Sequence, residues 1–96
     1  MKEPAIQPDT VVCWSRDAVA TDVNGEVVLM NLERDRCYGL GETGSEIWRR
    51  IGAPVKVANV IEDLQNEYEA PPGALEADVL ETLRQFLEEG LIRIAE

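Results

Sequence analysis

The chain has 96 residues, 45% hydrophobic and 29% charged, so its length and apolar content fit a single globular domain with one core. Its formal net charge of −10 repels phosphate backbones and favours cationic partners, which argues against a nucleic-acid ligand. No histidine is present, and Cys13 and Cys37 form no CxxC pair. The sequence therefore offers no ligand set for zinc or haem, no cofactor motif and no imidazole to activate a nucleophile, and we expect no enzymatic activity.

Residues 1–10 contain Pro4 and Pro8 among polar neighbours and predict a flexible N-terminal arm, with the folded domain over residues 11–96. The arm carries an acid where a secretory signal needs a basic start and an apolar run, and no apolar stretch is long enough to span a membrane. We therefore expect a cytoplasmic protein with reduced thiols.

The first half of the chain predicts three strands. Apolar and polar residues are mixed from Val11 to Val23 and permit a strand that ends near Val23, where Asn24-Gly25 favours a type I′ hairpin turn. Residues 26–32 are β-rich and apolar on both faces, which is typical of a central strand. A polar reversal over residues 33–36 leads to a short third strand at residues 37–40, which is an edge if the strands form a meander.

The second half predicts three helices. Thr43 and Glu46 have the spacing of a capping box, which predicts a short helix through Ile51. A second amphipathic helix of about three turns follows from apolar residues spaced three and four apart, namely Val57, Val60, Ile61, Leu64 and Tyr68. A third helix is expected over residues 74–89 and ends at Gly90, and residues 91–94 are compatible with a short terminal strand.

The third helix has an apolar arc wider than one packing seam. Stepping 100° per residue from Leu75 places the apolar side chains between 0° and 140° in an arc that comprises Leu75, Phe86, Val79, Leu83, Leu87 and Leu80, with Arg84 and Ala77 beyond it. The periodicity leaves two interpretations open: a helix sunk deep in a small core, or a helix with one edge along a groove.

Two aromatic residues, Tyr38 and Trp48, are candidate anchors for a ligand, although large aromatic side chains in so small a domain usually belong to the core. The order of elements predicts an α+β domain of winged-helix type, with a three-stranded antiparallel sheet followed by three helices. Many winged helices read DNA with a basic third helix. Residues 75–89 contain one arginine and five acids, so this helix has the wrong charge for that role.

Several segments resemble the PqqD-like family of peptide-recognition domains in order and spacing. They are residues 27–32 (VVLMNL), 37–40 (CYGL), 44–48 (GSEIW), the helix ending in Tyr68, and 75–79 (LEADV). The resemblance covers residues 18–94 and is nearest to the stand-alone domains of lasso-peptide pathways. The chain departs from the family at Gly41, in its second hairpin and at residues 55–57, all of which are turns or caps.

The resemblance implies that the domain binds the leader segment of a ribosomally made precursor peptide. The leader would add a strand to residues 36–40, and its apolar side chains would enter a cleft beside the third helix. The site residues expected on this basis are Arg36, Cys37, Tyr38, Gly39, Leu40, Ala77, Leu80, Glu81, Arg84 and Leu87. In lasso systems the resemblance suggests a Tyr-x-x-Pro leader, and Glu81 or Asp78 could pair with a leader lysine.

The expected partners are that leader, a separate leader peptidase and a cyclase, with no nucleic acid and no membrane. Three alternatives remain open: a peptide carrier of pyrroloquinoline quinone synthesis, a winged-helix DNA-binding regulator, and a structural subunit of a larger enzyme.

Overall fold

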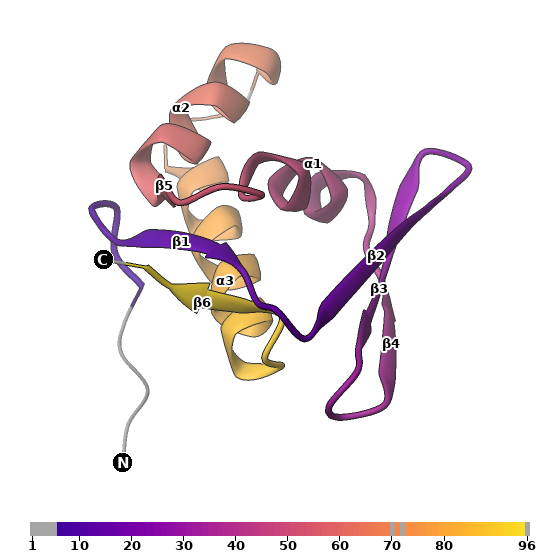
Figure 1. The fold of residues 1–96 in the computed structure, drawn as a ribbon. Helices are drawn as coiled ribbons and strands as arrows, with labels where there is room; N and C mark the ends of the chain where they lie inside the picture. The colour runs from indigo at the N-terminus through magenta and orange to yellow at the C-terminus, as the bar shows by residue number, and fades with distance from the viewer. Residues whose placement is uncertain (1–5, 70, 72, 96) are drawn as a thin grey trace.

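The computed structural model describes residues 6–69, 71 and 73–95, and two small sheets and three helices enclose its core (Figure 1). In chain order the elements are β1 (Val11–Trp14), β2 (Ala18–Val23), β3 (Glu26–Asn31), β4 (Arg36–Gly39), α1 (Glu42–Arg50), β5 (Val55–Lys56), α2 (Val57–Glu67), α3 (Ala74–Glu88) and β6 (Ile92–Ile94). The predicted α+β architecture, with a three-stranded antiparallel sheet, three helices and a short C-terminal strand, is confirmed.

The larger sheet is the expected meander β2-β3-β4. Asn24 and Gly25 have φ values of 54° and 87°, and Val23 pairs with Glu26, as the type I′ hairpin requires. β3 is the central strand and buries Val27 and Leu29 on its inner face, while β4 is an edge.

The single strand permitted over residues 11–23 is in fact two strands in different sheets. A turn at residues 15–17 separates them, and β1 joins the second sheet, whose order is β5-β1-β6. β6 pairs with β1 through Val12 and Ile94, which lie at opposite ends of the chain. Hydrophobic periodicity carries no signal for so remote a pairing.

The predicted capping box is wrong. α1 begins at Glu42 with Gly41 at its N-cap and no side-chain cap, so Thr43 lies inside the helix. Ser45 is buried, and its Oγ accepts the backbone N–H of Val27 at 2.9 Å and lies 3.4 Å from the carbonyl oxygen of Leu40. The hydroxyl therefore bridges the end of the β3–β4 ladder. The N–H of Val27 is buried and needs a partner within the protein, whereas the exposed N–H groups at the start of α1 can bond to water.

The second and third helices agree with their predicted patterns. α2 buries Val57, Val60, Ile61 and Leu64, and Gly90 follows α3 with a left-handed φ of 73°. α3 buries the part of its apolar arc that runs from Leu75 to Leu83, while Leu80 and Leu87 are half-buried at the other edge of the arc.

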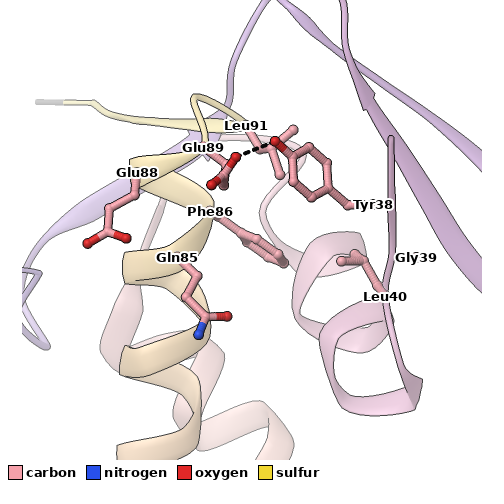
Figure 2. A pocket seen from close by; sticks show the side chains of 8 residues that line it. All are labelled: Tyr38, Gly39, Leu40, Gln85, Phe86, Glu88, Glu89 and Leu91. Carbon is pink, nitrogen blue, oxygen red and sulfur yellow. Dashed lines mark hydrogen bonds between the residues drawn. The ribbon is translucent and has the colours of Figure 1, made fainter. Parts of the chain in front are cut away.

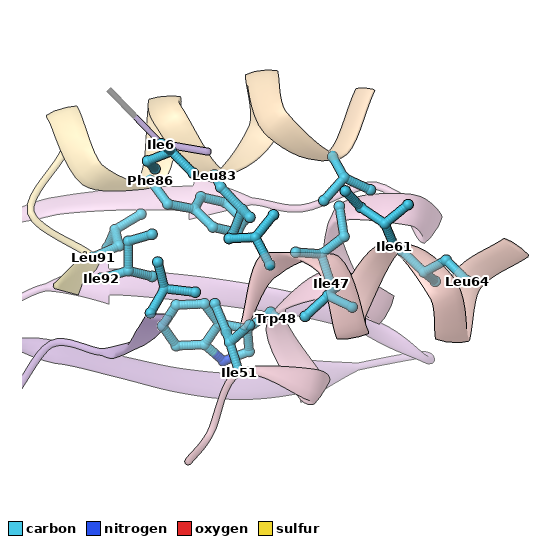
Figure 3. Close-up of a cluster of buried hydrophobic side chains, with 14 of the residues drawn as sticks. Ile6, Ile47, Trp48, Ile51, Ile61, Leu64, Leu83, Phe86, Leu91 and Ile92 are labelled. Atoms are coloured by element: carbon cyan, nitrogen blue, oxygen red, sulfur yellow. The ribbon is translucent and has the colours of Figure 1, made fainter. Parts of the chain in front are cut away.

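The core gathers side chains from all three helices (Figure 3). Trp48 is 2% exposed, stacks on Trp14 at 5.0 Å and meets Phe86 edge-on at 5.8 Å, so it is a core residue rather than a ligand anchor.

Of the N-terminal arm, residues 1–5 lie outside the described part of the chain, and residues 6–10 pack against the domain. Ile6 is buried in the core, and the carbonyl oxygens of Pro8 and Thr10 accept the N–H groups of Ala58 and Val57. These bonds satisfy N–H groups that the first turn of α2 would otherwise leave free.

Candidate functional site

A cleft of about 420 Å³ lies between the edge strand β4 and the C-terminal half of α3 (Figure 2). Its walls come from β4 and the residue after it on one side, and from α3 and the turn into β6 on the other. The lining residues are Tyr38, Gly39, Leu40, Gln85, Phe86, Glu88, Glu89 and Leu91.

The backbone of β4 has free hydrogen-bonding groups beside this cleft. The N–H of Leu40 donates to the carbonyl of Val27 at 2.9 Å, which identifies the residues of β4 that form hydrogen-bonded pairs with β3. Because paired and unpaired residues alternate in such a ladder, the N–H and C=O groups of Tyr38 point toward β3. Those of Cys37 and Gly39 point away from the sheet, so the edge can accept another strand.

The side chains of β4 point alternately to the inner and the outer face of the sheet. Tyr38 and Leu40 are half-buried on the inner face and line the cleft, while Cys37 is exposed on the outer face. A strand added to β4 would therefore also place every second side chain over the cleft.

Tyr38 and Glu89 join β4 to the end of α3 across the cleft. The Tyr38 hydroxyl donates to Oε2 of Glu89, and this carboxylate lies 3.7 Å from a guanidinium nitrogen of Arg36 and 4.0 Å from one of Arg34. The hydrogen bond to Glu89, helped by partial desolvation and the negative charge of Glu89, raises the pKa of Tyr38 above its ordinary value of 10.0, although Arg36 opposes the shift. The phenol therefore keeps its proton to a higher pH than a free tyrosine does, and its hydrogen bond to Glu89 holds the ring in the cleft wall.

Asn31 fastens the β3–β4 turn to the same end of α3. Its side chain is 2% exposed, its Nδ2 donates to the carbonyl of Glu89 at 2.7 Å, and its Oδ1 accepts the N–H groups of Glu33 and Arg34. A Cβ on Gly90 would lie only 2.9 Å from this Nδ2, so the turn and the helix approach closely at a glycine. Sequence reasoning missed both Asn31 and Glu89. A lone Asn within the apolar strand VVLMNL was the available signal for the first.

The structure brings half of the expected site residues to the cleft region. Arg36–Gly39 form β4 and Leu40 follows it, so the strand part of the predicted site is contiguous with the cleft. The α3 part is not among the lining residues: Ala77, Glu81 and Arg84 are exposed, and Leu80 and Leu87 pack against the core. The cleft instead meets another edge of α3, at Gln85, Phe86 and Glu89. Periodicity located the wide arc but gave no information on which side of it β4 lies.

The exposed surface of α3 is acidic, with Glu76, Asp78, Glu81 and Glu88 all open to solvent. This surface opposes binding to a phosphate backbone. No helix within the described residues is long and apolar enough to cross a membrane, and the same part of the chain holds no cluster of potential metal ligands. Cys13 and Cys37 are free thiols, the first buried and the second exposed.

Comparison with known proteins places this geometry in a family. Residues 26–92 match the family model described as coenzyme PQQ synthesis protein D (PqqD), and the chain therefore belongs to the PqqD family. Proteins of this family are non-catalytic peptide-binding proteins, so the expectation that the chain is not an enzyme is confirmed. No curated protein sequence matches the chain significantly.

Three solved structures share the fold. TbiB1 in complex with the TbiA(beta) leader peptide has a TM-score of 0.79 at 25% identity, covering 84% of this chain and 94% of its own. Lasso peptide synthetase B1 complexed with the leader peptide has a TM-score of 0.71 at 18% identity, covering 85% and 96%. The PqqD truncation of Methylobacterium extorquens PqqCD, a stand-alone RiPP recognition element, has a TM-score of 0.76 at 20% identity, covering 93% and 95%.

Proposed function

We propose that this domain binds the leader segment of a ribosomally synthesised precursor peptide as an additional antiparallel strand on β4. One observation carries the proposal: the free backbone groups of Cys37 and Gly39 lie beside a cleft with apolar walls from Leu40, Phe86 and Leu91. Strand addition needs both parts, since main-chain bonds supply affinity and side-chain pockets supply specificity. Two of the similar structures contain leader peptides, which supports the same use of the fold here.

The antiparallel arrangement sets the direction of the bound leader. Its N-terminal end lies near Leu40 and its C-terminal end near Arg36, because β4 runs from Arg36 to Gly39. Leader residues alternate between the cleft and the outer face of the sheet. An apolar leader side chain that enters the cleft contacts the Tyr38 ring, which the bond to Glu89 holds in place. The net charge of −10 speeds the encounter with cationic leaders more than it tightens the complex.

Two edges of α3 are candidates for the specificity-determining wall. The cleft favours the edge with Gln85 and Glu89, whereas the family resemblance implied the edge with Leu80 and Leu87. We propose that the leader lies against Gln85, because this edge of α3 lines the cleft opposite Tyr38 and Leu40.

The bound precursor is then presented to a separate leader peptidase and a cyclase, as in lasso-peptide synthesis. The domain contributes by raising the local concentration of the precursor and not by chemistry. The description of the family model favours a second candidate, a carrier for the precursor of pyrroloquinoline quinone. Both candidates use the same edge and cleft and differ in the peptide that they accept.

Fluorescence anisotropy with labelled synthetic leaders tests the proposal. A lasso leader with a Tyr-x-x-Pro motif and the precursor peptide of pyrroloquinoline quinone synthesis are titrated in parallel with the purified domain. Saturable binding of the lasso leader alone supports the first function, and binding of the other peptide alone supports the second. If neither peptide binds, the proposed function is wrong.

Matched tryptophan variants locate the α3 wall. Gln85→Trp fills part of the cleft and should weaken leader binding at least tenfold. Arg84→Trp introduces the same side chain about 100° further round the helix and should leave binding unchanged. Both wild-type residues are exposed, so neither change disturbs the core. The opposite ranking would move the leader to the Leu80 edge.

A further inference from the structure

The outer face of the β2-β3-β4 sheet carries a cluster of exposed apolar side chains. Val19 and Val23 on β2 are each 49% exposed, Met30 on β3 is 39% exposed, and Leu32 just after β3 is 59% exposed. Large apolar side chains gathered on one surface of a small monomer mark an interaction site more often than chance exposure does.

The strand register shows that these residues share one face. Val19 pairs with Met30 and Met30 with Cys37, so these three side chains form a row across the sheet. Thr21, Val28 and Gly39 form the next row. Residues directly opposite each other in a sheet point to the same side, and the inner side is the one that buries Val27 and Leu29.

Charge is confined to the ends of this face. Neither row contains an ionisable group other than the Cys37 thiol, although the chain carries 19 acidic and 9 basic residues. Glu26 lies at one end, opposite Val23, and Asp17 lies at the other, where its carbonyl accepts the N–H of Leu32 at 2.9 Å. An apolar centre with a charged rim is the usual anatomy of a protein–protein interface.

The face is continuous with the edge that takes the leader. A leader strand on β4 becomes the fourth strand of the sheet, and its residues opposite Cys37 and Gly39 project onto this same face. A Cβ at Gly39 would meet no atom within 4 Å, so no side chain rises between the domain and the added strand at this residue. A partner seated there would touch the domain and its bound leader together.

We propose that this outer face, extended by the leader, is the docking surface for the leader peptidase that processes the bound precursor. The proposal rests on the proposed function. The matching surface on the peptidase has an apolar centre flanked by lysine or arginine side chains, which complement Asp17 and Glu26. A second copy of the chain fits less well, because two domains of charge −10 would bring like-charged rims together.

The test uses the leader peptidase of the lasso-peptide pathway whose leader the domain binds, with binding measured by calorimetry to the domain alone and to the domain–leader complex. The wild-type complex should bind the peptidase more tightly than the domain alone. Met30→Lys and, as a second variant, Leu32→Lys should each weaken binding at least tenfold, since desolvated anchors at the centre of an interface carry most of its energy. Asn59→Lys adds the same charge at an exposed position of α2 and should bind like wild type.

Leader affinity, measured separately by anisotropy, should be unchanged in all three variants. Wild-type peptidase affinity in both Met30→Lys and Leu32→Lys would overturn the docking surface while leaving leader binding intact. A concentration-dependent dimer of the chain alone that Met30→Lys dissociates would assign the face to a second copy and also overturn the proposal. Loss of leader binding in the wild-type protein would instead count against the proposed function.

Discussion

Substitution of Cys37 by proline changes the free edge of β4 at a single atom group. The outward N–H of Cys37 takes no part in pairing with β3, so proline removes a bond that only an added strand would use. Proline is tolerated on edge strands for this reason, and the fold should survive the change. Tyr38→Pro, one residue later, would remove an inward bond to β3 and should destabilise the sheet.

The magnitude follows from the ladder geometry. Cys37 and Gly39 each present one N–H and one C=O, and Cys37→Pro removes one of these groups. A typical hydrogen bond contributes about 0.5–1.5 kcal/mol net, and a leader carbonyl left unpaired in the interface costs about 1–3 kcal/mol. We therefore expect leader affinity to fall by about 1–3 kcal/mol, which corresponds to roughly five- to 150-fold.

Anisotropy with the labelled leader measures this loss, and urea denaturation shows whether the variant is folded. Cys37→Ser is the matched control, because it changes the side chain but keeps the N–H, and its affinity should equal that of wild type. A folded Cys37→Pro domain that binds the leader with unchanged affinity would show that the leader does not pair with β4 at this residue.

Two further predictions concern stability. Ser45→Ala leaves the buried N–H of Val27 without a partner and should lower the free energy of unfolding by about 1–3 kcal/mol, whereas Thr43→Ala should change it by less than about 0.5 kcal/mol in urea denaturation. If Thr43→Ala lowered the free energy of unfolding as much as Ser45→Ala, Thr43 would cap α1 after all. The raised pKa of Tyr38 means that its stabilising bond to Glu89 is complete below pH 10.0 and is lost as pH rises through the raised value. The stability difference between wild type and Tyr38→Phe should therefore shrink at alkaline pH, and a constant difference would contradict this assignment.

The sequence by itself determined the elements that local physics controls. Asn24-Gly25 supplies the positive φ values of the hairpin turn, and the spacing of Val60, Ile61 and Leu64 defines the buried face of α2. The apolar run of β3 indicated the central strand, and from this the edge position of β4 followed. Each of these signals lies within a few residues, where backbone preference and side-chain periodicity act directly.

Only the tertiary structure decided how distant segments meet. β1 pairs with β6 across most of the chain, and the buried hydroxyl of Ser45 accepts the N–H of Val27 from the distant strand β3, while the cap expected from Thr43 does not form. The same holds for the cleft: periodicity found a wide apolar arc on α3, but the edge that faces β4 depends on how the helix is rotated against the sheet. That rotation is set by the packing of the whole core, which no single segment encodes.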